Sequence, residues 1–83
     1  MEELPLVTAA EYRGGFKIEL TFFDGTKAVV DFEEWLHGPI FEPLRGEDEF
    51  RRFFIDAGTI AWPNGADIAP ETLYERAKAN SAA

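Results

Sequence analysis

The sequence predicts a single α+β domain, in which short helices cover a three-stranded antiparallel meander. Three observations support this fold class. Apolar and polar residues alternate through the first half of the chain, glycine-containing turns separate the alternating stretches, and the second half carries helix-start and helix-end signals. A chain of 83 residues has room for one domain, placed at 1–83 with an ordered core over about 4–79.

The middle strand is expected at residues 16–23, where apolar side chains occupy every second position. A three-residue loop at 23–25, with Gly25 in a left-handed conformation, leads to the third strand at 26–32. A two-residue loop would place charged residues on the apolar face, so we reject it. The expected pairs are Phe16 with Phe32, Ile18 with Val30, Leu20 with Ala28 and Lys17 with Asp31.

The first strand is expected at 6–12, joined to the middle strand by a three-residue loop at 13–15. The pairs that follow are Tyr12 with Phe16, Ala10 with Ile18, Leu6 with Phe22 and Glu11 with Lys17. On the solvent face, Glu11, Lys17 and Asp31 then form a row of alternating charge, a favourable cross-strand arrangement.

The apolar face of this meander needs a cover, which the following residues supply. Asp31 and Glu34 have the spacing of an N-cap and its N3 carboxylate, so a short helix should run through Leu36 and end at Gly38. Residues 40–44 are interpreted as a turn with three apolar anchors. A second helix is expected at 47–53, where acids come first and bases last.

A short hairpin is expected at 54–62, with its loop at 56–58, before Pro63-Asn64-Gly65 breaks the strand. Pro70 is suited to a first helical position, so the last helix should run from Glu71 to about residue 79. Its inward side chains should be Leu73, Tyr74 and Ala77. The last residues, 80–83, are expected to form a loose tail.

The charge balance excludes several kinds of partner. Sixteen acidic residues against eight basic ones give a net charge of −8 and a pI near 4.5. Direct binding to nucleic acid or to an anionic membrane needs a basic face, so neither is expected. The sequence has no cysteine, which excludes disulfides and thiolate zinc sites. With no signal peptide or membrane span in view, we expect a cytoplasmic protein.

No motif of catalysis, cofactor binding or metal binding is recognisable, so we expect no enzyme, no cofactor and no metal. The single histidine, His37, precedes Gly38 and is interpreted as a helix C-terminal residue. The acidic runs at 33–34 and 47–49 are contiguous, whereas calcium loops place oxygen ligands at alternating positions around a glycine. These runs are interpreted as solvated first helical turns.

The most distinctive stretch is the segment 62–70. An architectural interpretation has Asn64-Gly65 turning the chain, Trp62 and Ile68 anchoring it, and Asp67 binding nearby amides. A functional interpretation makes it a recognition loop. Its candidate residues are Trp62, Asn64, Gly65 and Asp67.

The chain resembles a bacterial family catalogued as domain of unknown function 2442, over roughly residues 4–76. The matching residues are Phe22-Phe23-Asp24-Gly25, Gly38-Pro39-Ile40-Phe41-Glu42-Pro43-Leu44, Phe50, Phe53, Gly58 through Pro70, and Leu73-Tyr74. The resemblance implies no catalytic residues. It implies that some members carry a helix-turn-helix domain, while others look like single-domain products encoded beside a second small protein, in the manner of toxin–antitoxin pairs.

These observations favour a non-enzymatic interaction or regulatory module, which binds a protein partner or another copy of itself as a homodimer. Exposed strand edges and the acidic charge both suit such a role. The alternative is a small-ligand or sensor domain with its site near the 62–70 loop. An enzyme that uses His37 with a carboxylate is the third hypothesis.

Overall fold

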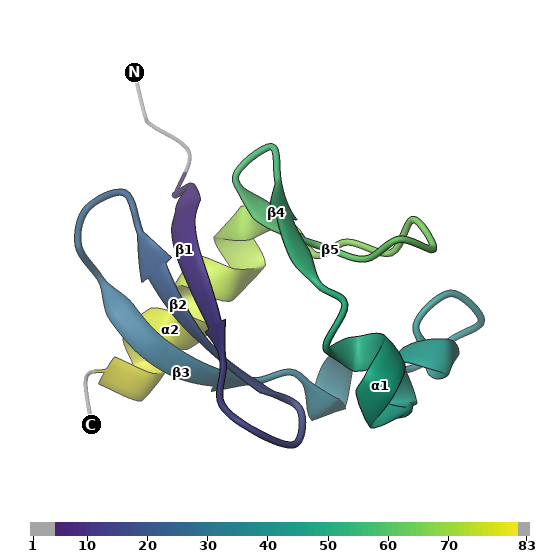
Figure 1. Cartoon of the computed structure of the whole chain (residues 1–83). Coiled ribbons are helices and arrows are strands. Elements are labelled where there is room, and N and C mark those ends of the chain that lie inside the picture. The colour runs from purple at the N-terminus through teal and green to yellow at the C-terminus, as the bar shows by residue number, and fades with distance from the viewer. Residues whose placement is uncertain (1–4, 82–83) are drawn as a thin grey trace.

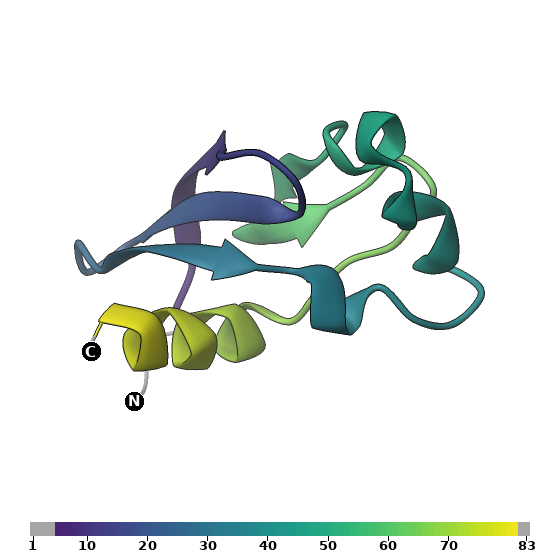
Figure 2. The same cartoon turned by 90° about the horizontal axis from the view of Figure 1, so that it is seen from below.

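The α+β class is confirmed by a computed structural model, which describes residues 5–81 (Figure 1). Its elements in chain order are β1 (Val7–Tyr12), β2 (Lys17–Phe22), β3 (Lys27–Asp31), the 3₁₀ turns η1 (Glu33–Trp35) and η2 (Glu42–Arg45), α1 (Glu47–Phe50), β4 (Phe54–Asp56), β5 (Thr59–Ala61) and α2 (Pro70–Ser81). The first three strands form one sheet in the order β1-β2-β3, and β4 and β5 form a second. Helix α2 lies along the first sheet beside β3 (Figure 2). No helix of the described chain is long and apolar enough to cross a membrane.

The predicted hairpin between β2 and β3 is confirmed. The pairs Lys17–Asp31, Ile18–Val30 and Leu20–Ala28 occur in the expected register. Gly25 has φ +88°, the left-handed conformation that a three-residue loop requires. The amide of Phe22 closes this loop by donating to the Thr26 carbonyl at 2.8 Å.

The predicted pairing of β1 with β2 is wrong by two residues. Tyr12 lies opposite Ile18 and Ala10 opposite Leu20, so the three-residue loop is 14–16 and not 13–15. Side chains alternate with a period of two, so a two-residue slip leaves every side chain on the same face. The apolar pattern therefore could not distinguish these registers. In the observed turn, Gly14 and Gly15 both have positive φ angles, +94° and +56°.

The predicted charge row is correct for Lys17 and Asp31 but wrong for Glu11. Glu11 lies opposite Glu19, a like-charge pair that would be unfavourable by itself. Arg13 compensates, because its guanidinium lies 2.7 Å from the Glu19 carboxylate and 3.3 Å from that of Glu11. Glu11 on β1, Glu19 on β2 and Arg13, which directly follows β1, thus replace the expected alternation.

Leu6 does not face the core as expected. A β-bulge between Val7 and Ala9 places Val7 opposite Phe22, so Val7 is buried while Leu6 stays 38% exposed. A bulge inserts one extra residue into a strand and so exchanges the two faces beyond it.

The covering segments occur in the predicted order but with different lengths. The first helix is the 3₁₀ turn η1, whose Glu33 amide donates to Asp31 Oδ1 at 2.9 Å. The second, α1, ends at Phe50 and not at residue 53. In the turn at 40–44, Leu44 is buried, but Ile40 is exposed. The last helix extends through Ser81, so the expected loose tail begins too early; residues 82–83 lie outside the described chain.

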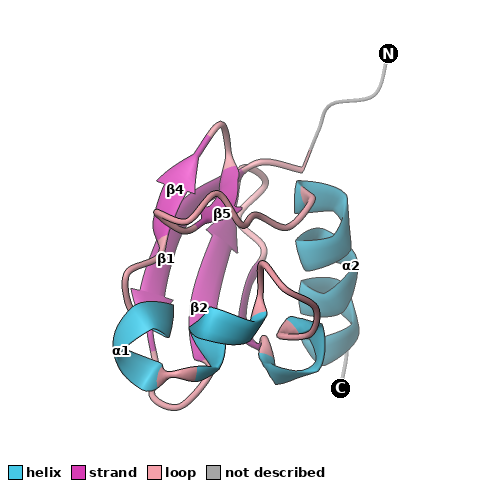
Figure 3. Ribbon diagram, turned by 90° about the vertical axis from the view of Figure 1, so that its right-hand side faces the viewer, coloured by secondary structure: helices cyan, strands magenta, loops and turns pink. Residues whose placement is uncertain are grey.

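The second hairpin is confirmed, with a two-residue turn at Ala57-Gly58 in place of the expected three-residue loop. Strand β5 is buried because β4 lies along one of its edges and residues 66–68 along the other. Figure 3 shows these strands packed as a layer on one side of the molecule and α2 on the other side. The predicted inward residues Leu73 and Ala77 of α2 are fully buried, and Tyr74 is partly buried.

The turn at residues 57–58 offers a matched pair of stability tests. A Cβ atom at Gly58 would lie 2.6 Å from Leu6 Cδ2, and the residue has φ +78°. Gly58→Ala should therefore lower the free energy of unfolding by about 1–3 kcal/mol. Ala57 already has φ +52°, so Ala57→Gly should raise it by about 0.5–1 kcal/mol. Urea unfolding measures both changes, and equal effects at the two positions would contradict this account.

The Tyr74 hydroxyl joins α2 to the β2–β3 loop by donating to Asp24 Oδ2 at 2.5 Å. This bond, followed by that of the Thr26 amide, lowers the pKa of Asp24 from 3.8 to about 2. A lowered carboxyl pKa stabilises the fold above about pH 4, and the contribution is lost as the pH falls toward 2. Tyr74→Phe should raise the Asp24 pKa toward 3.8 and weaken this acid dependence. An NMR titration of the Asp24 carboxyl carbon measures the change; an unshifted midpoint would contradict the assignment.

Candidate functional site

Trp62, the first residue of the candidate recognition loop, lies in the core. Its side chain is 1% exposed, and its ring centroid lies 5.8 Å from that of Phe50 and 6.1 Å from that of Phe32. The indole Nε1–H donates to the Phe50 carbonyl at 2.9 Å. Both the apolar ring and the polar nitrogen of Trp62 are thus used inside the molecule.

Asn64 and Gly65 form the tip of the loop. Gly65 has φ +93°, and its amide donates to the Trp62 carbonyl at 3.0 Å. Asn64 Oδ1 accepts from the amide of Ala66 at 3.0 Å, which holds the turn. Asn64 Nδ2 donates to the carbonyl of Ile40 at 2.9 Å, which ties this loop to a second one.

The segment then returns along β5. Asp67 is exposed and forms an antiparallel bridge with Ala61, while Ile68 is largely buried. The amide of Ile68 donates to the Ile60 carbonyl, and the Thr59 hydroxyl donates to the Ile68 carbonyl. These contacts give Trp62, Gly65 and Ile68 the positions that the architectural interpretation expects. The recognition role of the loop stays a prediction.

The two loops joined by Asn64 form what we call the loop corner, comprising residues 38–41 and 62–66. Both loops project at the same end of the molecule, beyond α1 (Figure 1). Ile40 is 44% exposed there, and Pro39 and Pro63 are also exposed. The 38–41 loop is closed by the amide of Glu42, which donates to the Gly38 carbonyl at 2.9 Å. The exposed Ile40 side chain therefore lies on a loop whose backbone is held by two hydrogen bonds.

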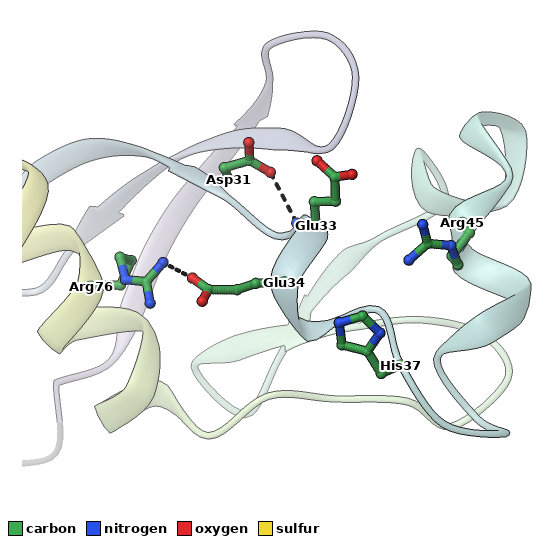
Figure 4. Close-up of a pocket in the computed structure, with 6 residues that line it drawn as sticks. All are labelled: Asp31, Glu33, Glu34, His37, Arg45 and Arg76. Atoms are coloured by element: carbon green, nitrogen blue, oxygen red, sulfur yellow. Dashed lines mark hydrogen bonds and ion pairs between the residues drawn. The ribbon is translucent and has the colours of Figure 1, made fainter.

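A second candidate is a shallow depression of about 430 Å³ (Figure 4). Its walls come from the end of β3, from η1, from η2 and from α2. The lining residues are Asp31, Glu33, Glu34, His37, Arg45 and Arg76. The sequence draws attention to His37 and to the acidic pair 33–34 but to neither arginine, because no local spacing connects residues on four separate elements.

Several polar groups around this depression bind one another. Arg76 pairs with Glu34 and lies 5.3 Å above the Trp35 ring. Arg45 donates to the Leu36 carbonyl at 3.2 Å. Figure 4 shows the side chains spread around the rim. In residues 5–81 no cluster of three or more histidine and carboxylate side chains is suited to hold a metal ion.

The fold and these surfaces define a small α+β domain with a structured loop corner and a charged depression. The family model described as protein of unknown function DUF2442 matches residues 7–79, so the chain belongs to that family. No curated protein and no solved structure matches the chain.

The contact between the two loops can be tested separately from the turn that Asn64 holds. Asn64→Asp keeps the oxygen that accepts from Ala66 but removes the donor to Ile40. It should lower the free energy of unfolding by about 0.5–1.5 kcal/mol, and Asn64→Ala should lower it further, because both bonds are lost. Urea unfolding measures the difference. Equal stability of the two variants would show that the turn bond contributes nothing measurable.

Proposed function

We propose that this chain is a non-catalytic interaction module that binds a partner protein with a basic surface. The observation that carries the proposal is the exposed Ile40 side chain on the loop corner, beside an acidic stretch. An apolar anchor surrounded by charge is a common arrangement at protein interfaces.

The backbone around Ile40 is held in place before any partner arrives. Asn64 donates to the Ile40 carbonyl, and the Gly38 carbonyl accepts from the amide of Glu42. Binding orders flexible segments at a cost in free energy, so a loop that is already ordered binds more tightly for the same contacts. The loop corner is suited to present Ile40 to a pocket on the partner.

The acidic stretch next to the loop corner determines the chemistry of that partner. Glu42 begins η2, and the exposed acids 47–49 form the first turn of α1, which packs against η2. Nearby arginines compensate in part, but Arg45 donates to Leu36 and Arg51 lies over the Tyr12 ring. With a net charge of −8 for the whole chain, a basic partner would be attracted and oriented at a distance.

The most direct candidate partner is a small protein encoded beside this one, as in toxin–antitoxin pairs, where this chain would act as the regulatory half in the cytoplasm. A small-ligand or sensor role near Trp62 has less support. Of its candidate residues, Asp67 is exposed, but the indole nitrogen of Trp62 and the Asn64 amide are both bound within the protein.

The test is binding of the purified neighbouring gene product by isothermal titration calorimetry. Ile40→Asp should weaken binding by about tenfold or more, because it places a charge in the apolar contact. Ile55→Asp is the matched control, since Ile55 is similarly exposed (40%) but lies on β4. Both variants should remain folded by circular dichroism.

Salt dependence tests the electrostatic part of the proposal. Binding should weaken as ionic strength rises, and Glu47→Lys with Glu49→Lys should lower the association rate. No binding by the wild-type chain, or equal losses in the Ile40 and Ile55 variants, would contradict the loop corner as the binding surface.

A further inference from the structure

The free edge of β3 offers a second surface, and we propose that two copies of this chain pair antiparallel through it. The proposal is independent of the loop corner, because β3 lies at the edge of the meander and contributes none of residues 38–41 or 62–66. It rests on the direction of the backbone groups of β3, on its exposed side chains and on how the other sheet edge is occupied.

The register determines which backbone groups of β3 point outward. Near one end of the pair, Phe22 donates to the Thr26 carbonyl, and at the other end Phe32 donates to the Phe16 carbonyl. Bonding direction alternates along an antiparallel strand, so the backbone amides and carbonyls of the even-numbered residues 26–32 point toward β2. The amide and carbonyl groups of Lys27, Val29 and Asp31 therefore point away from the sheet. Such a row is a template for a further strand.

The side chains of these three residues on one copy are complementary to the same three side chains on a second copy. Lys27, Val29 and Asp31 are all exposed on the solvent face of the sheet, and Val29 is 40% exposed. An antiparallel pair with its two-fold axis at Val29 places Val29 against the Val29 of a second copy. It also places Lys27 of each copy opposite Asp31 of the other. The same patch then serves both chains, as an isologous dimer requires, and each opposite-charge pair is favourable.

The other outer strand, β1, is less available. Its Val7 amide already donates to the Gly58 carbonyl at 2.7 Å, and β4 lies against it. Farther along, Arg51 covers the Tyr12 ring at 5.1 Å. Helix α2 packs on β3, and its Asn80 Nδ2 donates to the outward carbonyl of Val29 at 3.0 Å. A carbonyl has two lone pairs, so this bond leaves room for another donor.

Pairing of this kind would join two meanders into one continuous sheet with the order β1-β2-β3-β3-β2-β1. The net charge of −8 on each copy opposes it at long range, while the two Lys27–Asp31 pairs favour it at contact. Association should therefore strengthen when salt screens the net charge, in contrast to the binding of a basic partner at the loop corner.

Sedimentation velocity over micromolar to millimolar protein, at physiological ionic strength, tests the proposal with the whole chain. We expect concentration-dependent formation of a dimer. Val29→Pro removes one outward N–H but no bond to β2, and proline is tolerated on edge strands. It should raise the dissociation constant about tenfold or more, whereas Val29→Ile, which keeps the N–H, should not.

A charge exchange identifies the register. Lys27→Asp alone and Asp31→Lys alone each create two like-charge pairs across the two-fold axis and should remain monomeric. An equimolar mixture of the two variants restores both opposite-charge pairs and should form a heterodimer. In hydrogen exchange, the amides of Val29 and Asp31 should slow with increasing concentration, while that of Ala28, already directed at β2, should not.

A wild-type chain that stays monomeric at millimolar concentration would overturn the proposal. A dimer unaffected by Val29→Pro and Lys27→Asp would also overturn it, as would a mixture of charge variants that does not associate. Binding of a strand from a different protein to β3, without self-association, would replace the second copy as occupant. Ile40→Asp should leave the dimer unchanged, so the outcome does not depend on the partner proposed above.

Discussion

The packing of Trp62 against Phe50 and Phe32 holds the two halves of the chain together. Phe32 directly follows β3, Phe50 ends α1, and Trp62 directly follows β5, so the three rings come from three separate segments. The bond from Trp62 Nε1 to the Phe50 carbonyl gives a buried donor its partner and adds direction to the contact. A chain of this size buries a small core, so a few large aromatic side chains account for much of its stability.

This central contact also explains which surfaces remain available. Because Trp62 is drawn into the core, the loop that follows it turns sharply and uses its polar groups internally. Asn64 then acts as a tie between two loops, and the exposed side chain at that tie is Ile40. The side chain that we propose for recognition is therefore Ile40, whose backbone carbonyl accepts a bond from the 62–66 loop.

The loop corner and the β3 edge are separate surfaces, and the two proposals expect opposite responses to salt. As proposed, the corner would bind a basic partner, because acidic residues begin the nearby helix α1. The β3 edge carries Lys27 and Asp31 in an order that would complement a second copy. A dimer paired through β3 would present two loop corners at once. Two linked sites raise the effective affinity for a partner that can engage both.

The sequence by itself determined the presence of the strands, the faces and register of β2 and β3, the second hairpin apart from its loop length, and the start of the last helix. Alternation, turn glycines and Pro70 act locally, and in β2–β3 a one-residue error would have exposed the apolar face. Tertiary structure alone decided the β1–β2 register, because a two-residue slip changes no face. It also decided the bulge that buries Val7 in place of Leu6. It also decided the candidate sites. The tie from Asn64 to Ile40 spans 24 positions, and the charged depression draws on four elements, so only packing brings these residues together.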